Sequence, residues 1–239
     1  MPLFTDRIEA KDFPKMPKEY QDLLVRVLTI QTDSELGGPD LYVERWIRVA
    51  PTAEDQMLLA KTAAEEIDHH RKFRNILAEI GVDVSYLLKS RREEKILETF
   101  RYPLETWAEM GMFGLLIDRV GGFHLHDFAE STYLPLGRII PDIVREEKMH
   151  IWHGLKITRE LCQTEEGKAQ AQAALDKMYP RALDMFGLSS SRRSDQFKEW
   201  GIKQRTNQQC RLDYIAEVDP IIEELGLRIP DPLANRKYL

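Results

Sequence analysis

One short pattern occurs twice in this chain and constrains its fold more than any other feature. Glu66 is followed three residues later by His69, and Glu147 is followed three residues later by His150. In a helix, residues three apart lie on the same face, one turn from each other. Two such helices that face each other can hold a pair of metal ions, provided that two further helices each add a carboxylate. The pattern therefore predicts a bundle of four long helices around a carboxylate–histidine metal site.

Helical periodicity extends along most of the chain, whereas strand signals are nearly absent. Apolar residues spaced three and four apart, with Thr52 as a helix cap, predict four long helices followed by shorter ones. We expect long helices at about 20–36, 53–81, 104–131 and from about Pro141 past Leu161, shorter helices at 168–185 and 204–224, a surface loop at 189–192 and an extended tail at 230–233.

The long helices indicate one all-α domain. A chain of 239 residues can bury a substantial core, and no internal repeat or low-complexity linker divides it. We therefore expect a single domain over 1–239, with a four-helix core at about 17–165 and additional C-terminal helices at about 166–239.

Composition excludes several classes of function. The formal net charge of -6 and the scattered Lys and Arg residues provide no basic face for nucleic acid. Cys162 and Cys210 lack the spacing of a redox or metal motif and suit a reducing compartment. The sequence contains neither a signal-peptide pattern nor an apolar stretch of membrane-spanning length. We expect a cytoplasmic protein that binds neither nucleic acid nor a membrane.

The first and third long helices each contain a carboxylate that can complete the site. Glu35 follows an apolar stretch of the first helix, whereas its competitor Glu44 lies beyond a glycine–proline break. Asp118 interrupts an apolar run in the third helix, where a charge is costly unless it is paired or bound to metal. Glu109 and Glu130 remain alternatives on that helix, although Glu130 is close to its end.

Two further glutamates stand directly before the Glu-x-x-His pairs. We expect them to accept the outward N–H of the histidine on the opposite helix, Glu65 from His150 and Glu146 from His69, because such contacts orient metal-bound imidazoles. The alternative is that both are ordinary exposed glutamates.

Three glycines share the side of the third helix on which Asp118 lies: Gly114, Gly121 and Gly122. They predict either open space beside the metals for oxygen and substrate or close packing of helices, and the sequence does not decide between these. Structural or surface roles are expected for the other histidines, His70, His124, His126 and His153.

Mixed carboxylate and imidazole ligands suit iron or manganese. The same ligands allow three functions: an oxygenase acting on a small organic substrate, a ferroxidase or other iron-binding protein, and a non-catalytic structural subunit of an oxygenase complex. The extra C-terminal helices fit an iron-storage shell poorly, and the complete ligand set argues against a non-catalytic subunit. The ligands themselves favour a di-iron protein, in which bridging carboxylates shift as the metals react with dioxygen.

Several motifs, within and beyond the proposed site, resemble one known family. They are Ser34-Glu35, Ala60-Lys61, Thr106-Trp107-Ala108-Glu109-Met110-Gly111, Glu146-Glu147, Met185-Phe186-Gly187, Trp200-Gly201-Ile202-Lys203, Leu225-Gly226-Leu227 and Pro230-Asp231-Pro232. Over most of its length the chain resembles the catalytic A subunit family of bacterial phenylacetyl-CoA epoxidase, whose members are phenylacetic acid catabolic proteins. That family has Asp where most ferritin-like enzymes use Glu, which favours Asp118 over Glu109.

The resemblance implies a ferritin-like four-helix bundle and a non-haem di-iron monooxygenase of aromatic degradation. Its expected substrate is an aromatic acyl-CoA such as phenylacetyl-CoA, which the enzyme would epoxidise or hydroxylate. Electrons would come from a separate reductase component, and the chain would form a homodimer or pair with a related ferritin-like subunit. The two iron ions, or one iron and one manganese, would be held by Glu35, Glu66, His69, Asp118, Glu147 and His150.

Overall fold

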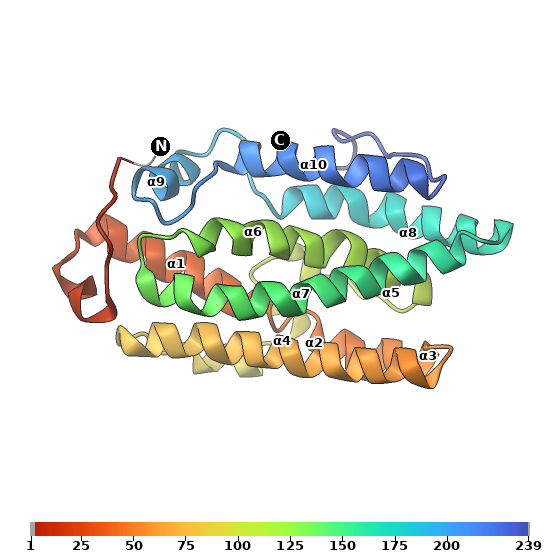
Figure 1. Ribbon diagram of the computed structural model, residues 1–239, viewed down its shortest axis with the longest axis horizontal. Coiled ribbons are helices and arrows are strands. Elements are labelled where there is room, and N and C mark those ends of the chain that lie inside the picture. Colours follow the sequence, from red (N-terminus) through yellow and green to blue (C-terminus); the bar gives the residue numbers. More distant parts are fainter. Residues whose placement is uncertain (1–2, 239) are drawn as a thin grey trace.

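Four long helical stretches run along one another in the computed structural model, which describes residues 3–238 (Figure 1). They are α1 (Lys18–Ser34), α4 (Ala53–Glu79), the third stretch, which joins α5 (Trp107–Met112), the π-helical turn η6 (Phe113–Asp118) and α6 (Arg119–Ala129), and α7 (Leu134–Leu161). Helix α4 packs against α1 and α7, and α7 packs against the third stretch. An isolated bridge between Ile8 and Tyr133 is the sole β pairing among the described residues. The predicted all-α fold is confirmed.

Shorter helices connect and cover the bundle. Between α1 and α4 the chain forms α2 (Pro39–Leu41), the π-helical turn η2 (Tyr42–Trp46) and α3 (Ile47–Val49). The C-terminal layer consists of α8 (Glu165–Asp184), α9 (Arg192–Glu199) and α10 (Asn207–Glu224), on the side of α5 and α6 away from α4 (Figure 1). The described chain also forms the 3-10 helices η1 (Ala10–Lys15), η3 (Ser85–Lys89), η4 (Arg92–Glu94) and η5 (Glu98–Arg101). No helix within 3–238 is long and apolar enough to cross a lipid bilayer.

Two apolar clusters fill the bundle, and the predicted metal site lies between them. On α4, Leu59 belongs to one cluster and Phe73 to the other. On α7 the two clusters are represented by Ile157 and Ile143. Each Glu-x-x-His pair therefore lies within the roughly three to four turns that separate the clusters, so apolar packing on both sides fixes the helices that carry the polar side chains.

The sequence located α4 well and α7 less well. Thr52 caps α4 as predicted, because its hydroxyl accepts a hydrogen bond from the Asp55 backbone N–H at 3.1 Å. The fourth helix begins at Leu134 with Pro135 in its first turn, so the prediction of a start near Pro141 was wrong. Pro141 lies inside α7, where its missing N–H removes only one backbone hydrogen bond.

Two helical segments were missed. Residues 39–49 are helical because Pro39 begins a new helix directly after the glycine pair. Helix α9 begins at Arg192, where the Ser191 hydroxyl accepts a hydrogen bond from the Ser194 backbone N–H at 3.3 Å. This short helix carries few apolar residues, so its periodicity was too weak to detect.

Helix α7 and the turn η6 touch through their backbones at two glycines. A Cβ added to Gly154 would lie 2.6 Å from Gly114 Cα and 2.6 Å from the Leu115 backbone nitrogen. We expect Gly154→Ala to lower the free energy of unfolding by about 1–3 kcal/mol, because neither backbone can yield without moving a long helix of the bundle. Urea denaturation followed by circular dichroism measures this change.

Gly121→Ala is the matched control for this prediction. A Cβ at Gly121 would meet no atom within 4 Å, and alanine in a helix is favoured over glycine by roughly 0.5–1 kcal/mol. The control is therefore expected to unfold at the same or a higher urea concentration. Equal destabilisation of both variants would contradict the proposed backbone contact.

Candidate metal centre

The six side chains singled out as ligands are all buried and gather inside the bundle. Glu35 stands at the C-terminal end of α1, and Asp118 is the last residue of η6. The two Glu-x-x-His pairs face each other from α4 and α7: Glu66, His69, Glu147 and His150. All four long helical stretches thus contribute to one buried polar cluster.

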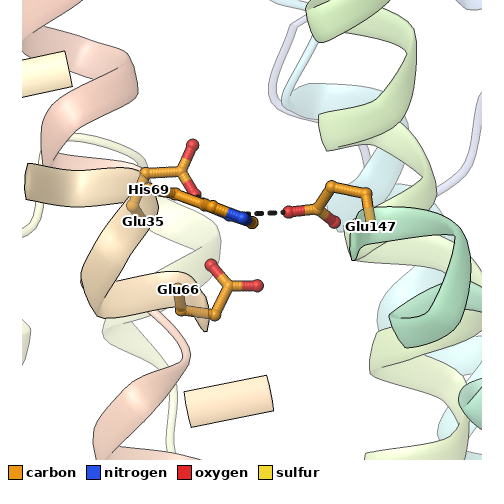
Figure 2. A group of neighbouring side chains, drawn as sticks. All are labelled: Glu35, Glu66, His69 and Glu147. Atoms are coloured by element: carbon orange, nitrogen blue, oxygen red, sulfur yellow. Dashed lines mark ion pairs between the residues drawn. The ribbon is translucent and has the colours of Figure 1, made fainter. Parts of the chain in front are cut away.

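Glu147 lies between the two histidines. Its Oε1 is 3.3 Å from His69 Nδ1, and its Oε2 is 3.5 Å from His150 Nδ1. Glu35 Oε2 lies 3.5 Å from the same His69 atom (Figure 2), and Glu66 Oε1 lies 3.2 Å from His150 Nδ1. The carboxylate of Glu147 therefore reaches both halves of the cluster.

The donor set suits a metal ion. One ligand atom from each of Glu35, Glu66, His69 and Glu147 lies within 4.8 Å of the others. The Nδ1 atoms of His69 and His150 are buried and make no hydrogen bond. Because an unsatisfied buried nitrogen is costly, two of them aimed at converging carboxylates indicate that cations belong there.

The carboxylates destabilise one another without a cation. Burial and the negative charge of Glu147 raise the pKa of Asp118 to about 8. Burial and Glu147 also raise the pKa of Glu66 well above its usual value. Glu147 shows the opposite shift: although burial opposes it, the neighbouring His150 and His69 lower its pKa to about 2. Positive charge placed among these groups would relieve the repulsion.

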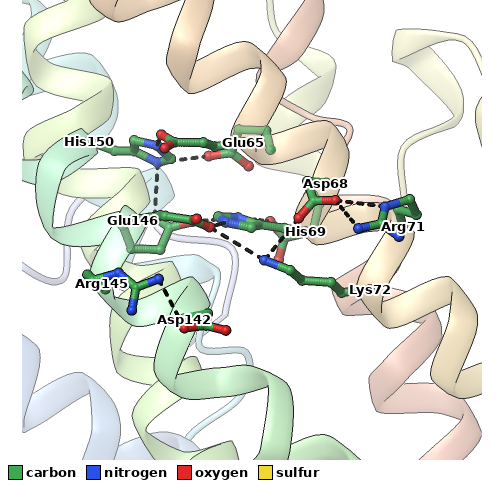
Figure 3. Close-up of polar contacts among 12 residues, drawn as sticks. Glu65, Asp68, His69, Arg71, Lys72, Asp142, Arg145, Glu146 and His150 are labelled. Carbon is green, nitrogen blue, oxygen red and sulfur yellow. Dashed lines mark hydrogen bonds and ion pairs between the residues drawn. The ribbon is translucent and has the colours of Figure 1, made fainter.

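Each histidine is held from outside by a glutamate of the opposite helix. His69 Nε2 is 2.8 Å from Glu146 Oε2, and His150 Nε2 is 3.0 Å from Glu65 Oε2 (Figure 3). These are the two crossed contacts that the sequence predicted. With the proton of each Nε2 held by its glutamate, the Nδ1 lone pair would be the one to face a metal ion at the centre.

Asp118 is held by a tyrosine that sequence reasoning missed. The Tyr42 hydroxyl donates a hydrogen bond to Asp118 Oδ2 at 3.3 Å. Tyr42 is the first residue of η2 and Asp118 is the last residue of η6, so both partners stand on π-helical turns. Such turns are rare in helices and occur frequently at functional sites.

The alternative carboxylates lie elsewhere. Glu109 accepts hydrogen bonds from the backbone N–H groups of Glu105 and Thr106 and pairs with Lys177, so it caps α5. Glu44 and Glu130 are exposed. The structure thus brings Asp118 and Glu35 together with the histidine pairs and leaves their competitors out.

The three glycines of the third stretch have different surroundings. Gly121 lines a cavity that also contains Asp118 and Glu147. Gly114 packs against the backbone of α7, at Gly154 and at the His150 carbonyl. Gly122 is not among the cavity-lining residues, and a Cβ there would lie 3.6 Å from Ile151 Cδ1. Gly121 therefore borders open space, whereas Gly114 allows two helices to pack closely.

The cavity beside the carboxylates has a volume of about 390 Å³. Phe113, Ile117 and Phe128 form part of an apolar wall, and the cavity continues past the α8–α9 connection. Basic side chains and an imidazole that sequence reasoning did not place at a site also line it, at Arg26, His124, Arg193 and Lys203. They come from distant parts of the chain, and Lys203 alone belonged to a motif already noticed.

Comparison with known proteins adds three findings. The family described as phenylacetic acid catabolic protein matches residues 6–237. The chain is 29% identical over 231 residues to the A subunit of 1,2-phenylacetyl-CoA epoxidase from Escherichia coli (strain K12), covering 94% of this chain and 74% of that protein. It is 25% identical over 223 residues to component B of benzoyl-CoA oxygenase from Aromatoleum evansii, covering 80% of this chain and 46% of that protein.

Proposed function

Because this chain belongs to the phenylacetic acid catabolic protein family, we propose that it is the metal-bearing subunit of an oxygenase that transfers oxygen to an aromatic acyl-CoA. The observation that supports this most strongly is the buried cluster of four carboxylates and two histidine Nδ1 atoms beside an apolar cavity. Both relatives carry oxygenase or epoxidase names and act on CoA thioesters by those names. The chain is accordingly an oxidoreductase.

The proposed ligands are Glu35, Glu66, His69, Asp118, Glu147 and His150, and the proposed ions are two irons, with an iron–manganese pair as the variant that the same donors allow. Bound there, the ions would supply the activation of dioxygen. Glu147 would help to hold both ions, because its two oxygens face different histidines. Glu65 and Glu146 would fix the orientation of the two imidazole rings through their Nε2 atoms. The apolar wall would keep water from the reacting ring.

A CoA thioester also fits the charge distribution at the cavity. Arg26 and Arg193 both line it and are exposed. Both residues line one cavity, and burial together with the positive charge of Arg193 lowers the pKa of Arg26. Neither forms an ion pair with a carboxylate within residues 3–238, and no carboxylate contributes to the pKa shift of Arg26. Two guanidinium groups at one cavity without an acidic partner favour a phosphate ligand.

We expect Arg26→Gln and Arg193→Gln each to raise KM for phenylacetyl-CoA by about 5-fold, because an exposed ion pair contributes on the order of 1 kcal/mol, while kcat stays nearly constant. KM for the N-acetylcysteamine thioester of phenylacetate, which lacks phosphates, is expected to stay unchanged. Steady-state assays with both substrates measure the difference. The exposed Arg48→Gln on α3 is the control. An equal rise for both substrates would contradict a phosphate role.

The relatives are named as parts of larger enzymes, one of them a component and the other a subunit. We propose that this chain likewise receives electrons from a reductase component and pairs with itself or with a related ferritin-like subunit. A ferroxidase is the second candidate function, because the metal donors alone would serve it. The apolar cavity favours the oxygenase.

The test uses protein reconstituted anaerobically with ferrous iron, then mixed with a reductase, the partner subunit, phenylacetyl-CoA and ¹⁸O₂. Incorporation of one labelled oxygen atom into the acyl product is expected. Rapid oxidation of ferrous iron without any oxygenated thioester would support the ferroxidase instead. Failure to bind iron at all would overturn the metal-bearing role and make a non-catalytic structural role the better account.

A further inference from the structure

Two polar side chains interrupt the apolar part of the cavity wall. His124 projects from α6, and Lys203 lies in the connection between α9 and α10. Both are partly exposed, and both line the cavity that contains Asp118. His124 is six residues beyond Asp118, which corresponds to about 9 Å of helix rise. The pair is therefore displaced from the metal centre by roughly the length of a small aromatic acyl group.

Lys203 has an unusual environment for a lysine. Its Nζ lies 5.4 Å from the ring centroid of Phe128 and 5.6 Å from that of Phe197. Within the part of the chain that the structure describes, no carboxylate forms an ion pair with the Lys203 ammonium group. The one hydrogen-bond contact of this group is with His124 Nδ1 at 3.5 Å. Asp127, whose negative charge acts on Lys203, is already engaged by Arg205 at 2.8 Å. A cationic group placed in an apolar wall without an anion has donors left over for a ligand.

His124 supports this arrangement as an acceptor. Burial, together with the positive charges of Lys203 and Arg205, lowers its pKa well below the usual value, so the imidazole is neutral. A neutral imidazole can accept one N–H of the Lys203 ammonium group through Nδ1. The remaining ammonium hydrogens stay available to the cavity.

The backbone around Lys203 is fixed. Gly201 has a φ of 63°, a left-handed conformation that glycine adopts without strain. The backbone N–H groups of Ile202 and Lys203 both donate to the Phe197 carbonyl, at 2.9 and 3.2 Å. The Thr132 N–H donates to the Gly201 carbonyl at 2.8 Å, which ties the connection to the bundle. Lys203 is thus held by the fold and is not a mobile surface group.

We propose that Lys203, oriented by His124, binds the thioester carbonyl oxygen of the substrate and thereby sets how far the aromatic ring reaches toward the metal centre. This inference rests on the proposed acyl-CoA oxygenase function. The phosphates of CoA would be bound farther out by Arg26 and Arg193, whereas the aromatic ring has no hydrogen-bond acceptor. The thioester carbonyl is the acceptor of an acyl-CoA that is nearest its ring.

The test compares two ligands that differ only in this carbonyl: phenylacetyl-CoA and 2-phenylethyl-CoA, a thioether in which CH₂ replaces C=O. Iron-loaded protein is titrated with each by calorimetry in the absence of dioxygen. We expect wild-type protein to bind the thioester about 10-fold or more tightly than the thioether, because a hydrogen bond to a charged donor contributes about 1.5–3 kcal/mol. Lys203→Met is expected to abolish this preference while leaving the affinity for the thioether unchanged.

Three further variants sharpen the result. Lys203→Gln keeps a shorter N–H donor and is expected to retain part of the preference, which serves as the test if Lys203→Met fails to fold. His124→Leu removes the orienting acceptor and is expected to reduce the preference without abolishing it. The exposed Lys89→Met on η3 is the matched control and should behave as wild type.

The two proposals fail in different ways. If iron-loaded wild-type protein binds neither ligand, the acyl-CoA function fails. If it binds both ligands equally well, the function stands and the role of Lys203 is overturned. If Lys203→Met lowers the affinity for both ligands equally, the role of Lys203 is likewise overturned, because the substitution would then act by changing the shape of the cavity.

Discussion

Glu147→Ala is expected to remove metal binding and oxygenase activity together. The two carboxylate oxygens of Glu147 face His69 Nδ1 at 3.3 Å and His150 Nδ1 at 3.5 Å, so its loss takes a ligand from both proposed metal positions. After anaerobic reconstitution with ferrous iron, elemental analysis should find about two irons per chain in the wild type and well under one in the variant.

Glu160→Ala is the matched control, because Glu160 is an exposed glutamate on the same helix α7. It should retain the wild-type iron content and activity. The double variant Glu147→Ala, His150→Ala should bind no more iron than the single one. Full iron content in Glu147→Ala would refute the proposed role of Glu147, whereas iron retained in the double variant as well would place the metals elsewhere.

Glu146→Ala and Glu65→Ala are each expected to lower metal affinity by about 10–100-fold, although neither residue is proposed to touch a metal. Each removes the acceptor of an outward imidazole N–H, at 2.8 Å for His69 and 3.0 Å for His150. The imidazole then loses its orientation and part of its basicity. Competition with a chelator of known iron affinity measures the change.

The conservative variants Glu146→Gln and Glu65→Gln keep a carbonyl acceptor and should restore most of the affinity. Glu79→Ala, an exposed position on α4, controls for a general effect of removing an acidic group. If alanine at 65 or 146 leaves the affinity unchanged, water or another group supports the histidine and the glutamates are ordinary helix residues.

The parts of the site that depend on local spacing could be predicted from the sequence. Glu66 and His69 share a helical face whatever the rest of the chain does, and so do Glu147 and His150. The crossed contacts to Glu65 and Glu146 follow because a residue adjacent to one ligand faces the neighbouring helix. Asp118 stood out since a carboxylate within an apolar run needs a compensating partner.

The parts that depend on packing could not be predicted in this way. Tyr42 reaches Asp118 only because η2 folds back beside the third stretch, and the break at the glycine pair concealed that helix. Arg26, Arg193 and Lys203 come from α1, α9 and the following connection, and nothing in their local sequence indicates a shared cavity. Pro141 led to a wrong start for the fourth helix, because proline is favoured in the first turn of a helix. In the structure Pro135 is the proline in the first turn of α7.

The π-helical turn η6 gives the third stretch a tolerance for a change in length that an ordinary helix lacks. A π turn closes its hydrogen bonds with one residue more than an α turn. Deleting a single residue between Phe113 and Asp118 would convert the π turn into an α turn and leave α6 facing the same way, so Gly121 and His124 would keep their places at the cavity. Deleting a single residue from α6 between Asp118 and His124 would meet no extra residue to absorb it, and would rotate the helix beyond it by about 100°.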